Sequence, residues 1–443
     1  MPSFVARVDD SRATGHALPP GWQAYALFGL LPVWWLLGLS MFIWPLIAAP
    51  LLATMLLEHW TIRAPRRFGI YLLLVGWMVV SGLVLRDAQR IEAWAWRGSF
   101  FVAGGILLLY LLNAPERRLP TRSIVNAMAF YWVIVVLGGW FGVLFPHVAL
   151  ASPAQHLLPS SIVHNQYVFE HVHLQFAEVQ HFLGYPVGRP ETFFAYTNAW
   201  GSAFAILTPF AVAAVVTTRD HRWRNILRLT MVASLVPVVF SLDRGLWLSL
   251  GAGILYAALR LGFRRDYRLV AVIGMTVIAI AAALLVTPLG NLASGRFQHQ
   301  TGDVGRLQRD QAATNQVLGQ PVTGFGAPQP NTVAGQSNIG TESEVFLLVY
   351  SHGIPGLFLF FLWFAYTLFR SARWRTPEAF WAHIVILIAC IQTPYYEITE
   401  RLPIVMVAAA IAYREIAKDG LPVARRRRAS VSDARTRVPA TIA

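Results

Sequence analysis

Apolar stretches long enough to cross a lipid bilayer recur along the whole chain, and they constrain its fold more than any other feature. Only 13% of the 443 residues are charged, against roughly 25% in a typical soluble protein. The stretches lack the period-two alternation of a membrane β-barrel. Because backbone groups in lipid must bond within their own segment, the stretches predict helices. We therefore expect an all-α integral membrane protein with a single polytopic domain over residues 24–418.

The lengths of the apolar stretches predict about twelve membrane-spanning helices. The first stretch, residues 24–57, is uncharged and too long for one crossing of a core about 30 Å thick. We expect it to form two short helices that turn near Ser40. The other ten spans are predicted near residues 68–85, 93–113, 123–145, 193–217, 225–241, 245–261, 268–287, 344–369, 378–395 and 401–417.

Basic residues follow every second span, and this pattern predicts the orientation. Cytoplasmic loops are enriched in Lys and Arg, so both termini are expected in the cytoplasm. These are an N-terminal tail at residues 1–23 and an Arg-rich, disordered tail at 419–443. Two long loops, 146–192 and 288–343, are then expected outside, the second between the ninth and tenth spans. Nearly all the basic residues lie in short loops between spans, where they set the topology. This explains the net charge of +14, and we therefore expect no nucleic-acid partner.

The ends and the cysteine content add two smaller expectations. The first 20 residues lack the apolar core of a signal peptide, so the first spans are expected to act as an uncleaved insertion signal. Cys390 is the only cysteine, which excludes an intrachain disulfide and a cysteine-based metal or redox site.

The element Asp243-Arg244-Gly245 stands at the very short connection between the seventh and eighth spans. Arg244 is therefore expected at the outer membrane–water boundary, where ionisable residues are costly and tend to mark substrate paths. A guanidinium group binds phosphate through two parallel hydrogen bonds. The alternative is an arginine that snorkels to the interface or pairs with Asp243.

A second arginine element, Gly305-Arg306-Leu307, lies in the second long loop. It opens a segment that is predicted to be helical, residues 306–318. Arg306 would lie near the N-terminus of that helix, where the helix dipole favours anions. The motif Pro321-Val-Thr-Gly-Phe-Gly follows. The alternative is a surface arginine on a loop helix.

Two carboxylates, Glu342 and Glu344, stand where this loop meets the tenth span. Either could act as a general base or orient an acceptor hydroxyl. The alternative is a helix N-terminus with Thr341 or Ser343 as N-cap and acidic residues in the first turn. Both interpretations can hold together.

Arg189 is a further candidate cation, because it begins an aromatic stretch that ends at Asn198 and leads into the sixth span. The alternative is a simple interfacial anchor.

In order and placement these elements resemble the bacterial O-antigen ligase and O-antigen polymerase family. Its members carry Ser-Arg-Gly between two spans, Gly-Arg before a loop helix, Pro-x-x-Gly-x-Gly, and His followed by Asn, Ser or Gln and, after nine residues, Gly-x-x-Gly. This chain has Asp243 at the Ser position and Glu342 at the His position, with Gly353 and Gly356 at the expected spacing. The missing His weakens assignment to the lipid A-core ligase branch and fits the polymerase branch better.

The resemblance implies a glycosyltransferase-C-like fold in the bacterial cytoplasmic (inner) membrane and an inverting, metal-independent glycosyltransferase without a cofactor. The implied donor is a glycan on a polyprenyl (undecaprenyl) diphosphate, and the acceptor is a glycan or lipid-linked glycan. Other polysaccharide-assembly proteins and membrane lipids are further expected partners. Arg244 and Arg306 would hold the leaving diphosphate and Glu342 would act as the base. The expected substrate-binding residues are Arg189, Asn198, Asp243 and Glu344.

Histidines are concentrated in the first long loop, which contains six of the twelve together with Glu170 and Glu178. His and Glu clusters can bind zinc. Residues 161–183 also predict an amphipathic interfacial helix, and we expect no metal.

Two other classes of function remain as alternatives. A transporter or flippase for lipid-linked sugars would suit twelve spans, but transporters usually show two similar halves and polar residues at the midplane. Here no similar halves are evident and the polar residues gather at the outer ends. A non-catalytic assembly protein would not need arginines at the outer boundary.

Overall fold

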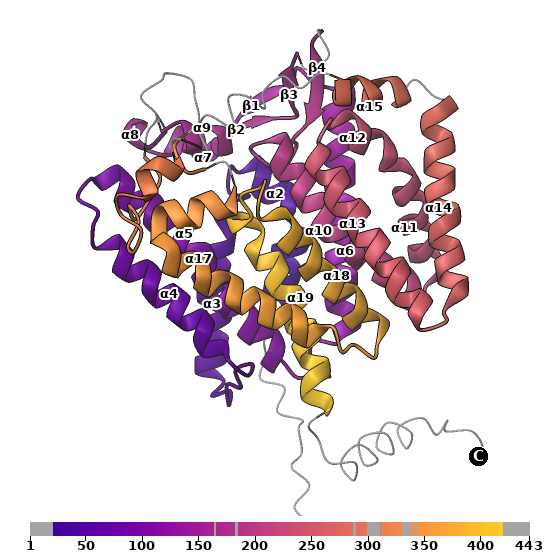
Figure 1. The fold of residues 1–443 in the computed structure, drawn as a ribbon, viewed down its shortest axis with the longest axis horizontal. Coiled ribbons are helices and arrows are strands. Elements are labelled where there is room, and N and C mark those ends of the chain that lie inside the picture. Colours follow the sequence, from indigo (N-terminus) through magenta and orange to yellow (C-terminus); the bar gives the residue numbers. More distant parts are fainter. Residues whose placement is uncertain are drawn as a thin grey trace, which may run out of the picture.

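The computed structural model describes residues 21–163, 165–181, 185–286, 289–298, 311, 313–329, 338–341 and 343–419. Each apolar stretch contains helix (Figure 1). The helices of these stretches are α1 (Trp22–Gly29), α2 (Leu31–Leu36), α3 (Ile43–Leu57), α4 (Phe68–Gly82), α5 (Ala88–Asn113), α6 (Thr121–Leu144), α10 (Thr197–Thr217), α11 (His221–Ala233), α12 (Leu235–Phe240), α13 (Arg244–Phe263), α14 (Tyr267–Val286), α17 (Glu344–Ser371), α18 (Pro377–Gln392) and α19 (Leu402–Asp419).

Six helical segments of the described residues are long and apolar enough to cross a membrane by length and composition. They are α5, α6, α10, the α11–α12 pair, α13 and α17. The mostly helical fold with these segments fits the all-α membrane protein predicted from the sequence. The number of twelve spans stays a prediction, because several helices are shorter.

One end of the molecule, which we call the loop end, carries the short elements of the first long loop (Figure 1). These are β1 (Ala149–Ala151), α7 (Pro153–Leu157), α8 (Ser160–Val163), α9 (Gln166–Val172), β2 (His173–Gln175), β3 (Ala177–Gln180) and β4 (Val187–Pro190). The helix α15 (Leu289–Gln298) also lies at this end. The 3-10 turn η1 (Thr399–Arg401) contacts α9 there, with Glu400 3.4 Å from His171.

The prediction of one interfacial helix over residues 161–183 is wrong. Helix α9 ends at Val172, and the chain continues into two short antiparallel pairs. In these pairs Leu150 faces Leu174 and Glu178 faces Arg189. The backbone hydrogen bonds of these residues are made with strands elsewhere in the loop. The apolar pattern of a single segment does not reveal such partners. The helix predicted from residue 306 begins outside the described residues, and residues 313–317 are helical.

The opposite end, which we call the arginine end, gathers the short basic connections. Arg118, after α5, pairs with Glu58, after α3, at 2.5 Å. Arg264, after α13, donates to the carbonyl oxygen of Trp374, after α17, at 3.0 Å and lies over its ring. The ends of α3 and α5 are therefore neighbours in space, and so are the ends of α13 and α17.

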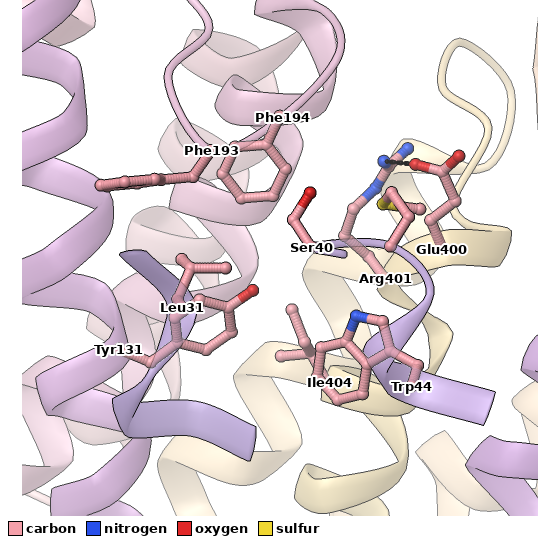
Figure 2. A pocket seen from close by; sticks show the side chains of 10 residues that line it. Leu31, Ser40, Trp44, Tyr131, Phe193, Phe194, Glu400, Arg401 and Ile404 are labelled. Carbon is pink, nitrogen blue, oxygen red and sulfur yellow. Dashed lines mark hydrogen bonds and ion pairs between the residues drawn. The ribbon is translucent and has the colours of Figure 1, made fainter. Parts of the chain in front are cut away.

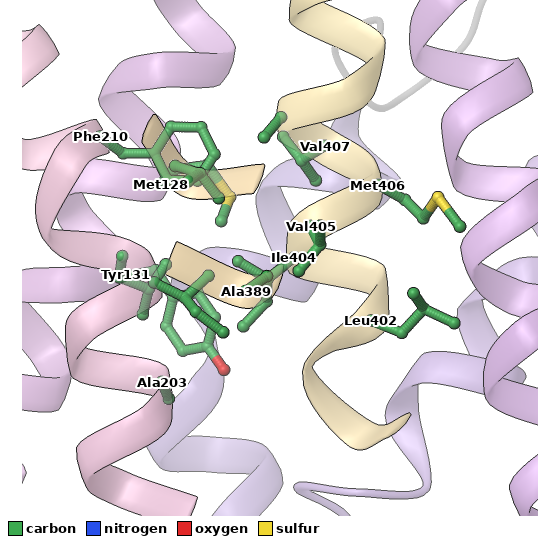
Figure 3. Close-up of a cluster of buried hydrophobic side chains, with 14 of the residues drawn as sticks. Met128, Tyr131, Ala203, Phe210, Ala389, Leu402, Ile404, Val405, Met406 and Val407 are labelled. Carbon is green, nitrogen blue, oxygen red and sulfur yellow. The ribbon is translucent and has the colours of Figure 1, made fainter. Parts of the chain in front are cut away.

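The core lies between α5, α6, α10, α18 and α19, with α19 in the middle of the bundle (Figure 3). Side chains such as Met128, Phe210 and Val405 are fully buried there. The run Ala408-Ala-Ala-Ile-Ala412 in α19 is buried throughout. Small residues let helix backbones approach closely in membrane proteins, and α19 can therefore be surrounded on all sides.

Candidate functional site

The turn between α12 and α13 is the centre of the candidate site. Leu242 adopts a left-handed conformation with φ of 50°, which is unusual for a residue with a branched side chain. Asp243 caps α13, and its Oδ1 accepts hydrogen bonds from the backbone N–H groups of Gly245 at 3.1 Å and Leu246 at 3.3 Å. Arg244, the first residue of α13, is half-buried directly beside the cap.

Arg189 joins the end of β4 to this turn. Its buried guanidinium group donates from Nε to the carbonyl oxygen of Ser241 at 2.6 Å. The other nitrogens donate to Gln180 Oε1 at 2.8 Å and to Asn198 Oδ1 at 3.3 Å. Two residues predicted at the site, Arg189 and Asn198, are therefore in contact. The bonds of Arg189 fix the first long loop onto the α12–α13 turn.

Tyr396, in the connection between α18 and α19, joins the turn to the start of α17. Its hydroxyl donates to Asp243 Oδ1, and its carbonyl oxygen accepts the backbone N–H of Glu344 at 2.8 Å. Three sequence elements, at residues 189–198, 241–245 and 343–344, therefore meet at one place at the loop end.

Glu344 is fully buried, and its carboxylate binds the same connection. It accepts from the backbone N–H groups of Ile398 at 2.8 Å and Thr399 at 3.0 Å, and from the Thr399 hydroxyl. Ser343 is the N-cap of α17, with its hydroxyl accepting from Phe346 N–H at 3.3 Å. The helix N-terminus that the sequence suggested as one alternative is thus present.

Burial raises the pKa of the Asp243 carboxyl, although the Tyr396 hydroxyl and the charge of Arg189 act in the opposite direction. Its Oδ2 is buried without a hydrogen-bond partner among the described residues. Burial also raises the pKa of Glu191, next to β4, to about 9, with Glu178 and Glu170 adding to the shift. Burial therefore shifts the Asp243 and Glu191 carboxyls towards their neutral forms.

Two of the predicted catalytic residues, Arg306 and Glu342, lie outside the described residues. The structure therefore describes Arg244 alone of the three. Among the described residues, no group of three or more His, Cys, Asp or Glu side chains could hold a metal ion.

The comparison with known families identifies the segment that contains most of these elements. Residues 229–361 match the family model described as O-antigen ligase. We refer to residues 229–361, after the family model that they match, as the O-antigen ligase domain. The match confirms the resemblance drawn from the sequence motifs. No curated protein matches the chain.

The O-antigen ligase domain runs from α11 to α17 and includes the α12–α13 turn and the cap of α17. Arg189 and Asn198 lie before it. The family supports a multi-pass membrane protein of surface polysaccharide assembly with a glycosyltransferase-like activity on lipid-linked glycans.

The glycine motifs of the O-antigen ligase domain have a structural explanation. Gly353 interrupts α17 with φ of 66°, and Val322 O lies 2.0 Å from where a Cβ on it would be. The interruption leaves carbonyl groups of α17 without helical partners. The backbone N–H groups of Phe325 and Gly326 donate to the carbonyls of Tyr350, at 2.8 Å, and Ser351, at 2.7 Å. The Pro-x-x-Gly-x-Gly segment thus packs backbone to backbone on the kink.

A charged network that the sequence motifs did not predict lies beside the O-antigen ligase domain. Arg97 of α5 pairs with Glu397 at 3.3 Å, and Arg401 pairs with Glu400 at 2.9 Å. His171 of α9 lies 3.4 Å from Glu400. These side chains are largely buried and join the first long loop to the α18–α19 connection. The sequence feature that could have revealed them is the run of Glu and Arg residues between two apolar spans.

A small pocket lies beside this network, and Arg401 and Glu400 form its polar wall (Figure 2). The other lining residues are Leu31, Ser40, Met41, Trp44, Tyr131, Phe193, Phe194 and Ile404. Arg401 Nε is buried there without a hydrogen-bond partner among the described residues. The cavity of about 10 Å³ has room for about one water molecule, so it is too small for a sugar.

Proposed function

We propose that the protein transfers or polymerises a polyprenyl-diphosphate-linked oligosaccharide onto a glycan acceptor at the outer face of the bacterial cytoplasmic membrane. The observation that carries the proposal is the meeting of three motif segments at the α12–α13 turn, where Tyr396 contacts both Asp243 and Glu344. This arrangement brings the neighbourhood of Arg244 close to the start of α17 at the loop end.

The proposed reaction is an inverting, metal-independent transfer. The acceptor hydroxyl attacks the anomeric carbon, the bond from that carbon to the diphosphate oxygen breaks, and the polyprenyl diphosphate leaves. Arg244 and Arg306 stabilise the negative charge on the leaving group. Glu342 takes the proton of the acceptor hydroxyl.

The contacts of the other candidates favour positioning over direct substrate binding. The carboxylate of Glu344 accepts three hydrogen bonds from the α18–α19 connection. Arg189 holds Ser241 and Asn198, and Asp243 caps α13. We propose that Arg189, Asn198, Asp243 and Glu344 hold the turn on which Arg244 stands. We propose that Arg244, half-buried at the first position of α13, is the described residue that contacts the diphosphate.

Substitution of the arginines tests the diphosphate role in a purified assay with a lipid-linked donor. Arg244→Ala and Arg306→Ala should abolish product while the protein still inserts and elutes as a single species. Arg244→Lys and Arg306→Lys should each rescue only part of the rate, because lysine lacks the planar pair of donors. Arg222→Ala, an exposed change on α11, is the matched control. Wild-type turnover by both Lys variants would show that no guanidinium group contacts the diphosphate.

Glu342→Gln tests the base in the same assay. Loss of the carboxylate should lower the rate by roughly 10²–10⁴ with little change in the amount of folded protein. Glu342→His restores the residue of the ligase pattern and should keep partial activity with a shifted pH profile. Near-normal turnover by Glu342→Gln would exclude the base assignment. If all variants moved lipid-linked sugar across the membrane of vesicles without forming product, the protein would be a flippase and not a transferase.

A further inference from the structure

An open cavity at the arginine end lies between the α3–α4 connection, the end of α5 and the end of α19. Its volume is about 510 Å³, which falls within the range of small-molecule sites, roughly 300–1,000 Å³. The lining residues are Thr61, Arg63, Ala64, Pro65, Arg66, Leu112, Asn113, Tyr413, Ile416 and Ala417. It lies at the other end of the bundle from the candidate catalytic site, so the proposed transfer reaction does not use it.

Two arginines give this cavity a positive rim. Arg63 and Arg66 are both exposed, and none of the described residues that line the cavity is acidic. Acidic side chains on or beside these elements have partners outside the cavity. Glu415 of α19 accepts from the backbone N–H and the hydroxyl of Thr376. Glu58 pairs with Arg118 at 2.5 Å, and Glu116 pairs with Lys418 at 2.7 Å. The charge of the rim is therefore not neutralised from within the cavity.

The backbone that carries this rim is fixed. Asn113, the last residue of α5, accepts from the backbone N–H of Arg63 at 2.8 Å and donates to its carbonyl oxygen at 3.0 Å. This pair of bonds holds the backbone of the loop at Arg63 in place relative to α5. Because this backbone is already ordered, a ligand that binds at the rim pays little additional backbone entropy.

The back wall of the cavity is largely apolar. Leu112 and Ile416 belong to the last turns of α5 and α19. The hydroxyl of the buried Tyr413 bonds to Thr367 Oγ1 of α17 at 3.0 Å, so the tyrosine ring is held against the bundle. A ligand for such a site has an anionic head for the rim and an apolar part for the wall. A soluble phosphate compound would use the rim alone.

We propose that this cavity binds the phosphate headgroup of an anionic membrane phospholipid. Basic pockets between transmembrane helices bind such headgroups, and each arginine near an anionic surface contributes about 1 kcal/mol, or about fivefold in affinity. Arg63 and Arg66 bind the phosphate oxygens. The glycerol and the first part of the acyl chains lie against Leu112, Tyr413 and Ile416.

Native mass spectrometry of the purified full-length protein tests the site with phosphatidylglycerol as the probe and phosphatidylcholine as the zwitterionic comparison. The wild type should retain phosphatidylglycerol preferentially. The double change Arg63→Gln with Arg66→Gln should weaken its retention by roughly 25-fold, the product of two fivefold effects. The matched control is Arg222→Gln with Arg228→Gln, which removes the same charge from exposed positions on α11.

The control separates a specific cavity from a diffuse basic surface. Equal loss of phosphatidylglycerol in both double variants would overturn the proposal, as would equal retention of the two lipids by the wild type. Thermal unfolding without added lipid checks that the cavity variant still folds, and its midpoint should match that of the control. If inorganic phosphate displaced phosphatidylglycerol at equal concentration, the site would belong to a soluble phosphate compound and the lipid assignment would fail.

Discussion

Asp243 is the residue where structural and chemical roles are most easily separated. It caps α13 and accepts the Tyr396 hydroxyl, and burial raises the pKa of its carboxyl. Asparagine supplies the same capping oxygen without the charge, so Asp243→Asn should change the free energy of unfolding by less than about 0.5 kcal/mol. Asp243→Ala removes the cap and should cost about 1–2 kcal/mol. Thermal unfolding of both variants in one detergent measures the difference.

The same pair of variants also reports on catalysis. If Asp243 only positions the turn, Asp243→Asn should keep most of the turnover. A variant with wild-type stability but no turnover would instead show that the carboxylate contacts substrate or a catalytic arginine.

His171 makes the attachment of α9 to the charged network depend on pH. Burial lowers the pKa of its imidazole, but the close contact with Glu400 and the charge of that carboxylate outweigh burial and raise the pKa overall. A raised pKa means that the contribution to stability is complete below the unfolded value of about 6.5 and is lost as pH rises through the folded pKa. Glu400 has a lowered pKa, so its contribution is lost only in acid, as pH falls through that folded value.

Hydrogen exchange of residues 166–172 measures this dependence. After correction for intrinsic exchange, protection of α9 should fall as the pH rises above the folded pKa of His171, because the imidazolium that faces Glu400 loses its charge. His171→Gln should remove that fall. His156→Gln, at an exposed position of the same loop, is the control. Unchanged protection of the wild type across this range would show that other contacts hold α9.

At the scale of elements, the positions of the long helices could be predicted because hydropathy is a local property of the chain. The predicted spans near 93–113 and 123–145 correspond to α5 and α6 within a few residues. The short strands of the first long loop could not be predicted, since their hydrogen bonds join residues 149–151 to 173–175 and 177–180 to 187–190.

The candidate site likewise contains residues that local motifs could predict and contacts that they could not. The motifs pointed to Arg244 and to the cap at Ser343, because each depends on a residue and its immediate neighbours. They could not reveal Tyr396, which contacts Asp243 across 153 residues of sequence. Nor could they show that Arg189 would bond to the backbone of Ser241. Contacts of this kind follow from the packing of helices, and a single sequence does not encode their partners in any local pattern.

The kink of α17 leads to a prediction for one element. An alanine at Gly353 would need a left-handed conformation and would place its Cβ against the Val322 carbonyl oxygen. Left-handed backbone costs about 1–3 kcal/mol for a residue with a side chain, and the collision adds to it. Gly353→Ala should therefore lower the unfolding midpoint and release the segment of residues 321–326 to proteolysis.

Gly251→Ala is the matched control for this element. Gly251 lies inside α13 with no heavy atom within 4 Å of an added Cβ. Alanine there should be neutral or stabilise by up to about 1 kcal/mol, because glycine is the poorer helix former. If Gly353→Ala were as stable as this control, α17 would have to adapt at the kink and the glycine would not be required there.

At the scale of the whole molecule, the separation of two chemically different ends predicts the orientation in the membrane. Short connections with arginines lie at one end, as the Arg118–Glu58 and Arg264–Trp374 contacts show, while the described elements of the first long loop and helix α15 of the second lie at the other. The positive-inside rule places the arginine end in the cytoplasm.

Cysteine labelling of intact cells measures this orientation, on a background in which the single native cysteine is replaced by Cys390→Ser. Gln320→Cys, at an exposed position of the second long loop, should react with an impermeant reagent from outside. Arg222→Cys and Arg117→Cys, both exposed at the arginine end, should react only after the membrane is opened. Labelling at position 222 or 117 in intact cells, with none at position 320, would show that the orientation is opposite to the predicted one. It would also place the α12–α13 turn in the cytoplasm, away from an acceptor at the outer face.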